Sequence, residues 1–278
     1  MSWRDFLVFA DASEDGFTRL GMAQEIAAAH EGHLEALVLT PMQVPMSVLP
    51  EAASAAYTQA EAAARDASAS VVRALQAKYA PGPKLSIYSC EAPANATRNA
   101  AGRAARTADL VVLGQPVTFD NSELDTDIYR GAVLLGGRPC LMLPRWEQRH
   151  DFGKRILISW KATPQSARAV EGALPFLTKA DKVRVCVANP RGEREGEGER
   201  SLERLATYLM RHGVKVEQTI TRESWEGPER MIISEIEGFS ADMLVMGAYE
   251  GAQFAEDIFN GVTPTVVRDS NVPILLAH

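Results

Sequence analysis

A carboxylate, an ammonium group and two glycines each stand directly after a short apolar run of the sequence. They are Asp11 and Gly114 in the first half, and Lys161 and Gly247 in the second half. Short apolar runs without alternation are typical of strands buried on both faces, and in sheets of parallel strands small ligands bind beyond the carboxyl ends. A charged side chain there can recognise polar groups, and a glycine lets a ligand approach the backbone. We therefore expect one ligand cleft in each half.

The elements that must position these residues alternate between strand and helix. In the first half, strands are predicted at 6–10, 34–39, 85–90, 109–113 and 140–143; in the second half, they are predicted at 156–160, 183–188, 214–220, 243–246 and 274–277. Helix-forming stretches separate these strands, among them the alanine-rich run 51–79 and the run 255–268. The second strand is expected to stop at Thr40 and Pro41, ahead of a proline-rich loop.

The second half of the sequence repeats the first. ADLVVLG at 108–114 matches ADMLVMG at 241–247 with an offset of 133 residues, and RPCLML at 138–143 matches VPILLA at 272–277 with an offset of 134. Two matches at nearly one offset indicate a duplicated unit. Because helices connect parallel strands by right-handed crossovers, we predict an α/β fold with two doubly wound, mainly parallel five-stranded sheets. The domains are expected at 1–146 and 153–278, joined by a charged connector.

The composition argues against several classes of protein. The chain of 278 residues is 46% hydrophobic and has a formal net charge of −7, so it can bury a sizeable core and offers no basic surface for nucleic acid or a membrane. Its three cysteines lie far apart without CxxC spacing, which argues against a zinc site and a disulfide framework and fits a reducing cytoplasm. The sequence has no apolar run long enough for a membrane span, and its N-terminus does not resemble a secretion signal.

No arrangement of residues in the sequence predicts catalysis. A GxxxxGK[ST] motif is missing, and no Ser/His/Asp or Cys/His nucleophilic arrangement is recognisable. We therefore expect neither an enzyme nor a metal site.

The duplicated layout, the two ADxxVxG strands and, above all, GAYEGAQFAEDIFNGVT at 247–263 followed by VPILLAH at 272–278 resemble the universal stress protein family in its tandem form. The resemblance implies Rossmann-like halves of the adenine nucleotide alpha hydrolase type, related by pseudo-two-fold symmetry. For members that bind ATP, it also implies an Asp at the end of the first strand, near the base and ribose. A G-2x-G-9x-G-[S/T] loop after the fourth strand wraps the phosphates in such members.

The second half departs from this pattern at most of its positions. Gly247 matches the first loop glycine, but Glu250, Asn260 and Gly261 stand at the second glycine, the third glycine and the Ser/Thr position. A carboxylate about 4 Å from a phosphate charge costs on the order of 4 kcal/mol at an effective dielectric constant near 20. Gly251, one residue later, partly replaces the lost glycine.

Lys161 stands where the resemblance places the base-contacting acid. Lys161 and Glu250 form either a charge pair in a vacated pocket or two separate solvated side chains. In the first half, Asp11 and Gly114 match the pattern, and Asp11 either contacts a ligand or caps the first helix. The following stretch, 115–127, has no glycine and several acidic residues, which disfavours a triphosphate.

The resemblance and these departures predict a non-catalytic stress-response or regulatory protein with a degenerate ATP loop in both halves and no required cofactor. The alternative is a stress regulator that binds ATP or AMP weakly in one half. Protein partners are expected, and a homodimer is left open. Because an uncovered apolar strand edge needs a partner, and because such edges mediate dimer contact in the family, we expect strands 140–143 and 274–277 to pair the two halves within one chain.

Overall fold

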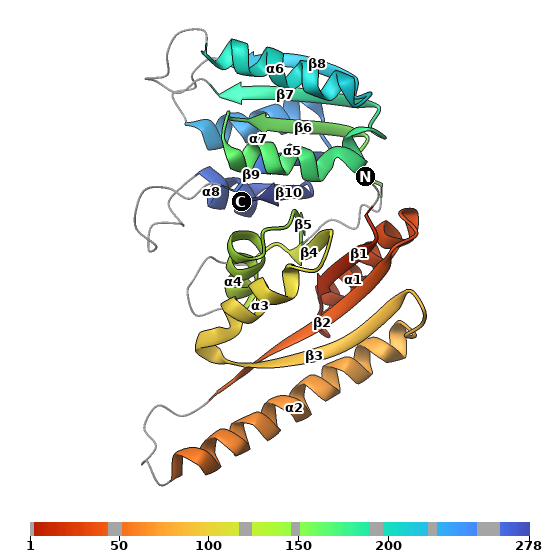
Figure 1. Ribbon diagram of the computed structural model, residues 1–278, viewed down its shortest axis with the longest axis vertical. Coiled ribbons are helices and arrows are strands. Elements are labelled where there is room, and N and C mark those ends of the chain that lie inside the picture. Colours follow the sequence, from red (N-terminus) through yellow and green to blue (C-terminus); the bar gives the residue numbers. More distant parts are fainter. Residues whose placement is uncertain are drawn as a thin grey trace. The chain divides into compact units, whose positions relative to one another are not determined.

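The computed structural model describes residues 3–43, 52–116, 124–145, 151–188, 197–221, 227–248 and 262–278. The chain forms two compact units (Figure 1). The first unit consists of Ser2–Gly114 and Asp120–Gly137, and the second unit is built mainly from Gln115–Phe119 and Arg138–His278.

The first unit has a parallel sheet in the order β3-β2-β1-β4. Its strands are β1 (Asp5–Phe9), β2 (His33–Met42), β3 (Leu85–Pro93) and β4 (Leu110–Gly114). Its helices are α1 (Glu14–Ala29), α2 (Ala53–Lys78), α3 (Thr97–Ala105) and α4 (Leu124–Arg130), with a 3-10 turn at Ala94–Ala96 and a π-helical turn at Gly131–Leu135. The central strands carry the most deeply buried runs, as the unalternating apolar pattern predicts.

The second strand is longer than the sequence predicts. β2 continues through Pro41 to Met42, paired with β3 up to Pro93. β1 pairs with β2 only as far as Leu37, apart from one hydrogen bond from Ala10 to Leu37. Beyond that point β2 has a partner on one side, and a proline costs little where the missing N–H would face away from a partner strand.

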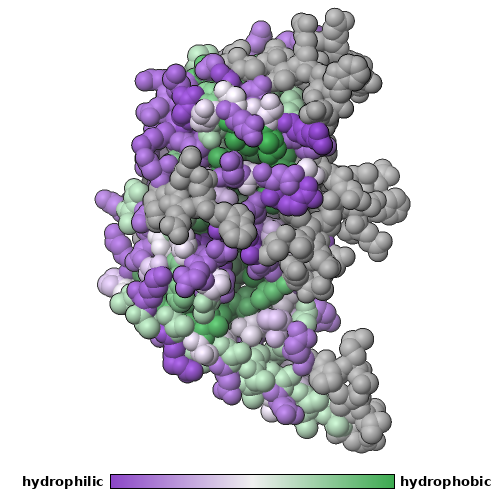
Figure 2. All heavy atoms as spheres, turned by 180° about the vertical axis from the view of Figure 1, so that it is seen from behind, coloured by the Kyte–Doolittle hydropathy of each residue, from purple (hydrophilic) through white to green (hydrophobic). Residues whose placement is uncertain are grey.

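The long alanine-rich helix forms as predicted, at Ala53–Lys78 rather than 51–79. Only Ala64, Ser68 and Leu75 of this helix are buried. The lower part of Figure 2, where α2 lies, is accordingly mostly pale green with scattered purple side chains. High intrinsic helix propensity, rather than burial of one whole face, accounts for its length.

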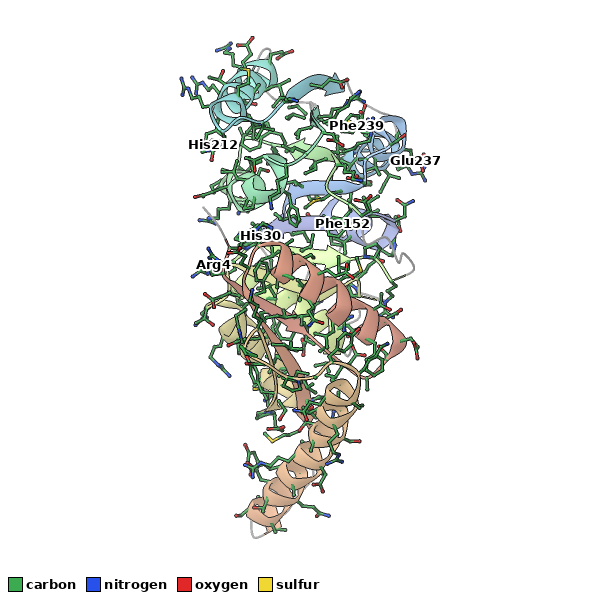
Figure 3. The ribbon with its side chains drawn as sticks, turned by 90° about the vertical axis from the view of Figure 1, so that its right-hand side faces the viewer. Arg4, His30, Phe152, His212, Glu237 and Phe239 are labelled. Atoms are coloured by element: carbon green, nitrogen blue, oxygen red, sulfur yellow. The ribbon has the colours of Figure 1, made fainter. Side chains whose placement is uncertain are left out.

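The second unit has a sheet in the order β5-β10-β9-β6-β7-β8, parallel except for β5. Its strands are β5 (Cys140–Leu143), β6 (Arg155–Trp160), β7 (Lys182–Ala188), β8 (Val216–Thr221), β9 (Met243–Gly247) and β10 (Ile274–Ala277). Its helices are α5 (Pro164–Leu177), α6 (Glu197–Arg211), α7 (Pro228–Phe239) and α8 (Val262–Asp269). Figure 3 shows α5 and α6, which His212 follows, on one side of this sheet, and α7 with Glu237 and Phe239 on the other.

β5 comes from the first half of the sequence but belongs to the second unit. It pairs antiparallel with β10, in a register that places Ile274 beside Met142 and Leu275 beside Leu141. Every residue of both strands is buried. The side-chain amide of Gln115 also joins this unit, because it donates to the carbonyls of Val267, Arg268 and Ser270 at 2.5, 2.9 and 3.2 Å and so caps the end of α8.

The acid of the repeated ADxxVxG motif has a structural role in both units. Asp109 accepts hydrogen bonds from the backbone N–H groups of Arg4 and Asp5 at 2.7 and 3.1 Å. Asp242 accepts from Gly153, Lys154 and Arg155 at 3.0, 3.1 and 3.0 Å. Each carboxylate thus satisfies backbone donors at the start of the neighbouring strand, at the end of the sheet opposite the predicted clefts.

The predicted α/β architecture with a mainly parallel sheet is confirmed. Five strands come from each half of the sequence, and the pairing of β5 with β10 divides them between units as four and six. Of the helix predicted at 255–268, only the part from Val262 onward lies within the described residues, and it is helical to Asp269. Among the described helices, none is both long enough and apolar enough to cross a membrane.

The central position of β10 predicts a large cost for truncating one of its side chains. Leu275 is 0% exposed and pairs with Leu141 on one side and Val245 on the other. We expect Leu275→Ala to lower the free energy of unfolding of the second unit by about 2–5 kcal/mol, because it leaves a cavity in the core. Urea denaturation followed by circular dichroism measures this change.

The matched control is Met210→Ala, in the same unit, because Met210 is 60% exposed. It should change the free energy of unfolding by no more than about 0.5 kcal/mol. An equal loss in the two variants would contradict the assignment of β10 to the core.

Candidate functional site

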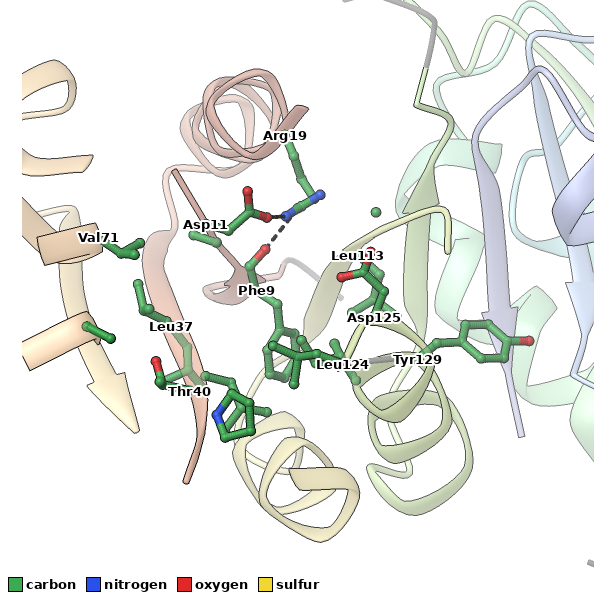
Figure 4. A pocket seen from close by; sticks show the side chains of 17 residues that line it. Phe9, Asp11, Arg19, Leu37, Thr40, Val71, Leu113, Leu124, Asp125 and Tyr129 are labelled. Atoms are coloured by element: carbon green, nitrogen blue, oxygen red, sulfur yellow. Dashed lines mark hydrogen bonds and ion pairs between the residues drawn. The ribbon is translucent and has the colours of Figure 1, made fainter. Parts of the chain in front are cut away.

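The first unit has a cleft beyond the carboxyl ends of β1 and β4, where the sequence predicts a ligand site. Its volume is about 250 Å³, slightly below the roughly 300–1,000 Å³ of typical small-molecule sites. Asp11 and Gly114 both line it, so the structure brings these two predicted site residues together (Figure 4). The remaining walls come from β2, α2 and α4 and are mostly apolar.

A partly buried arginine, Arg19, occupies the polar end of this cleft. Nη2 of Arg19 lies 2.5 Å from Oδ2 of Asp11, and Nε of Arg19 donates to the Phe9 carbonyl at 2.9 Å. Figure 4 shows the guanidinium bridging these two acceptors. The side chain of Arg19 is 14% exposed, whereas that of Asp11 is 47% exposed. The carboxylate that the resemblance assigns to base and ribose contact is therefore already engaged by the protein itself.

The first turn of α1 completes the surroundings of Asp11. Ser13 is the N-cap of α1, and its hydroxyl accepts from the Gly16 N–H at 2.9 Å. Oδ1 of Asp11 accepts from the backbone N–H of Ser13 at 2.8 Å and from the Ser13 hydroxyl. The alternative that Asp11 itself caps the helix is therefore wrong, because Ser13 is the cap and Asp11 holds Ser13 in place.

Glycines allow this close packing. A Cβ on Gly16 would collide with Asp11, and a Cβ on Gly114 would collide with the guanidinium of Arg19. Gly114 therefore has a structural reason to be glycine in this unit, independent of any approach by phosphate. The space that a loop glycine leaves for a ligand is taken by Arg19.

The pKa of Asp11 reflects these contacts. Partial burial by itself would raise it, but the charge of Arg19 and the hydrogen bonds from Ser13 outweigh this effect. The pKa of the Asp11 carboxyl consequently lies below its ordinary value of 3.8. At neutral pH the carboxylate is ionised and paired.

The second unit has the corresponding strand ends but different side chains. Lys161 directly follows β6 and is exposed, and Gly247 ends β9 and is buried. Thr163 is the N-cap of α5 and accepts from the Ser166 N–H at 3.3 Å. A Cβ on Gly247 would collide with the backbone and hydroxyl of Ser166, so this glycine too is required by packing against the first turn of a helix.

Counting from the N-caps relates the two clefts residue by residue. Arg19 is six residues after Ser13, and the residue six after Thr163 is Ala169. Ala169 is 1% exposed. The second unit therefore has no guanidinium at this position, and Lys161 stands at the position of Asp11.

Four of the predicted site residues, Glu250, Gly251, Asn260 and Gly261, lie outside the described residues. The predicted alternatives for Lys161 and Glu250, a charge pair or separate side chains, therefore stay predictions. Among the residues that the structure describes, no three His, Cys, Asp or Glu side chains gather as a metal site would require.

Arg19 is the site residue that sequence reasoning missed. A faint signal existed, because Gly16 and Arg19 are spaced three apart on α1 and so share the face that meets the strand end. Nothing local distinguishes this arginine from a solvated one, since its role arises from the contact between α1 and the ends of β1 and β4.

Comparison with known proteins finds a family match for the second half of the chain. Residues 153–278 match the family model described as the universal stress protein family. Among curated proteins, none matches the sequence.

Solved structures extend the likeness to the whole chain. A universal stress protein from Archaeoglobus fulgidus DSM 4304 has a TM-score of 0.70 at 16% identity, over 98% of this chain and 96% of that chain. A candidate universal stress protein from Pseudomonas aeruginosa UCBPP-PA14 has a TM-score of 0.61 at 17% identity, over 99% and 93%. A functionally unknown protein from Pseudomonas aeruginosa PAO1 has a TM-score of 0.60 at 17% identity, over 99% and 92%.

At such identities the structural likeness shows a shared fold, and the family match at residues 153–278 supplies the family. Residues 153–278 therefore match the universal stress protein family, and nearly the whole chain has a fold like that of the Archaeoglobus fulgidus universal stress protein.

Proposed function

We propose that this chain is a non-catalytic stress-response protein in which neither cleft retains a complete nucleotide site. The observation that carries the proposal is the ion pair between Asp11 and Arg19, which engages the acid that a nucleotide base or ribose would need. Regulation would then depend on contacts with other proteins rather than on turnover of a bound nucleotide.

In the first unit, nucleotide binding would have to break contacts that the protein already makes. Releasing Asp11 would leave the Arg19 guanidinium, only 14% exposed, with the Phe9 carbonyl as its remaining acceptor among the described residues. An uncompensated charge with so little solvent access is unfavourable. The small cleft volume and the second carboxylate, Asp125, add to this barrier for a polyphosphate.

In the second unit, the sequence changes support the same proposal. Lys161 replaces the acid at the end of the first strand. Glu250 and Asn260 stand where the family pattern has loop glycines, although these two residues lie outside the described part of the chain. A carboxylate in a phosphate loop repels the ligand that the loop is built to hold.

A second candidate function is weak binding of ATP or AMP by the second unit alone. Two observations favour it: Ala169 stands at the position of Arg19, so no guanidinium occupies this position, and Lys161 supplies an exposed cation at the strand end. A lysine can hold phosphate as a point charge. Under this alternative, the ligand would sit with its phosphates near Lys161.

The chemistry of the cysteines supports a non-catalytic role. Cys140 and Cys186 are both buried in strands, at 0% and 1% exposure. Burial raises the pKa of the Cys140 thiol well above its ordinary value, so the thiol stays protonated and a poor nucleophile. Protein partners, including a second copy of the chain, are part of the proposal.

Calorimetric titration with ATP and Mg²⁺ separates the two candidates. We expect no measurable heat up to millimolar ATP, because both clefts lack the complementary charges. A dissociation constant for ATP in the micromolar range would contradict the proposal that neither cleft retains a complete nucleotide site. If binding is seen, Lys161→Ala should abolish it under the second candidate, whereas Arg168→Ala, an exposed arginine on the same unit, should leave it unchanged.

The ion pair of Asp11 also predicts a pH dependence of stability. Because the folded pKa of Asp11 is depressed, its contribution is present at pH values above about 4 and is lost as the pH falls through the lower folded value. Asp11→Asn should therefore lower the free energy of unfolding at pH 7 by up to about 1 kcal/mol, given the exposure of the carboxylate. The difference from the wild type should shrink in acid, as thermal denaturation between pH 7 and pH 2.5 measures.

The control for this series is Asp66→Asn, because Asp66 is an exposed aspartate on α2. The difference in free energy of unfolding between Asp66→Asn and the wild type should not become smaller as the pH falls. If the difference in free energy of unfolding between the wild type and Asp11→Asn stays constant from pH 7 to pH 2.5, then Asp11 is not held ionised by Arg19.

A further inference from the structure

The second unit has a groove between α5 and α6 that neither candidate function uses. Its volume is about 760 Å³, within the range of small-molecule sites. Its lining residues come from the end of β6, the loop after it and the facing sides of the two helices: Trp160, Ala162, Ala167, Val170, Glu171, Arg200, Ser201, Arg204, Leu205 and Tyr208. Trp160 and Ala162 flank Lys161 in the sequence, so the groove begins at the carboxyl end of β6, although neither Lys161 nor Gly247 belongs to its lining.

Small side chains open the groove and apolar ones form its base. Ala162 and Ala167 are exposed, so no bulky side chain covers this part of the surface. Val170 and Leu205 are buried and lie on opposite helices. An apolar body of a ligand would remove this surface from water, which is the main source of affinity in such sites.

Two arginines place positive charge on the α6 side. Arg200 and Arg204 are four residues apart on α6, so they share one helix face. Both are exposed, and neither makes a hydrogen bond or ion pair with another residue in the described ranges. Among the described lining residues, Glu171 on α5 is the one acidic side chain, so these residues together carry a net positive charge on a chain whose overall charge is −7.

Trp160 gives the groove an aromatic wall. A flat aromatic ring offers a large apolar surface on which another aromatic body can stack. Tyr208, 37% exposed, provides a second aromatic surface on the same groove.

We propose that this groove binds a small amphiphilic organic anion. Its apolar or aromatic body would pack on Trp160, Val170 and Leu205, and its carboxylate, sulfonate or phosphate would be held by Arg200 and Arg204. Charge complementarity supports this occupant over a cationic or neutral one.

The probe for the test is 8-anilinonaphthalene-1-sulfonate, an aromatic anion whose fluorescence rises when it leaves water. We expect saturable binding with one site per chain and an affinity that falls as salt is added, because the arginines are exposed. The double variant Arg200→Ala/Arg204→Ala should weaken binding about tenfold or more, since it removes both charged donors.

The matched control is Arg168→Ala/Arg211→Ala, which removes two positive charges as well. Arg168 on α5 and Arg211 on α6 are exposed and lie outside the groove. The control variant should bind the probe within about twofold of the wild type. Circular dichroism checks that both double variants fold. Equal binding by the two double variants, or equal weakening, would overturn the proposal.

Trp160→Phe tests the position of the probe. Four tryptophans are present in the chain, and binding in the groove should quench mainly Trp160, so most of the quenching should disappear in this variant while binding persists. Quenching that is unchanged would place the probe elsewhere and overturn the proposal.

Competition then identifies the head group. 2-Naphthoate and 2-naphthyl phosphate should displace the probe, and the stronger of the two names the preferred anion. Neutral 2-naphthalenemethanol should displace it at least about tenfold less well. Displacement by the neutral alcohol at the same concentration as the anions would contradict the role of the arginines.

Discussion

The first helix of each unit packs directly against a glycine at the end of the fourth strand, and the geometry of both clefts depends on this contact. Ser13 and Thr163 begin the helices immediately beyond β1 and β6. A Cβ on Gly247 would collide with the backbone of α5 at Gln165 and Ser166, whereas a Cβ on Gly114 would meet only the end of the flexible Arg19 side chain. Glycine is therefore a packing requirement at Gly247, and at Gly114 it leaves the space that Arg19 fills.

Because of this contact, the side chain at one position of the first helix determines which charges lie at the strand ends of each unit. The side chain six residues after the N-cap is Arg19 in the first unit and Ala169 in the second. Arg19 reaches the strand ends and pairs with Asp11, whereas Ala169 leaves Lys161 exposed beyond β6. The two copies have thus diverged in charge while keeping the same backbone frame, since a fold and the function placed on it are separate properties.

Much of the frame could be predicted from the sequence because the signals are local. The strands 140–143 and 274–277 are found at the predicted residues, and α5 begins where a Thr-Pro pair predicts a helix start. Interactions between distant segments could not be predicted in this way. Arg19 looks like any helix arginine until α1 meets β4, and the extension of β2 through Pro41 depends on where β1 ends.

The stability of the frame depends only slightly on the charges in its clefts, which explains how those charges could change. The core consists of buried apolar strands, among them β5, β9 and β10, and the repeated Asp109 and Asp242 satisfy backbone donors at the opposite end of the sheets. The residues at the carboxyl ends are therefore free to vary without a large cost in folding. The same reasoning covers the groove between α5 and α6: Arg200 and Arg204 are exposed and carry no structural duty among the described residues. Their placement beside the apolar surface of Val170 and Leu205 and the indole ring of Trp160 is accordingly better explained by a ligand than by the needs of the fold.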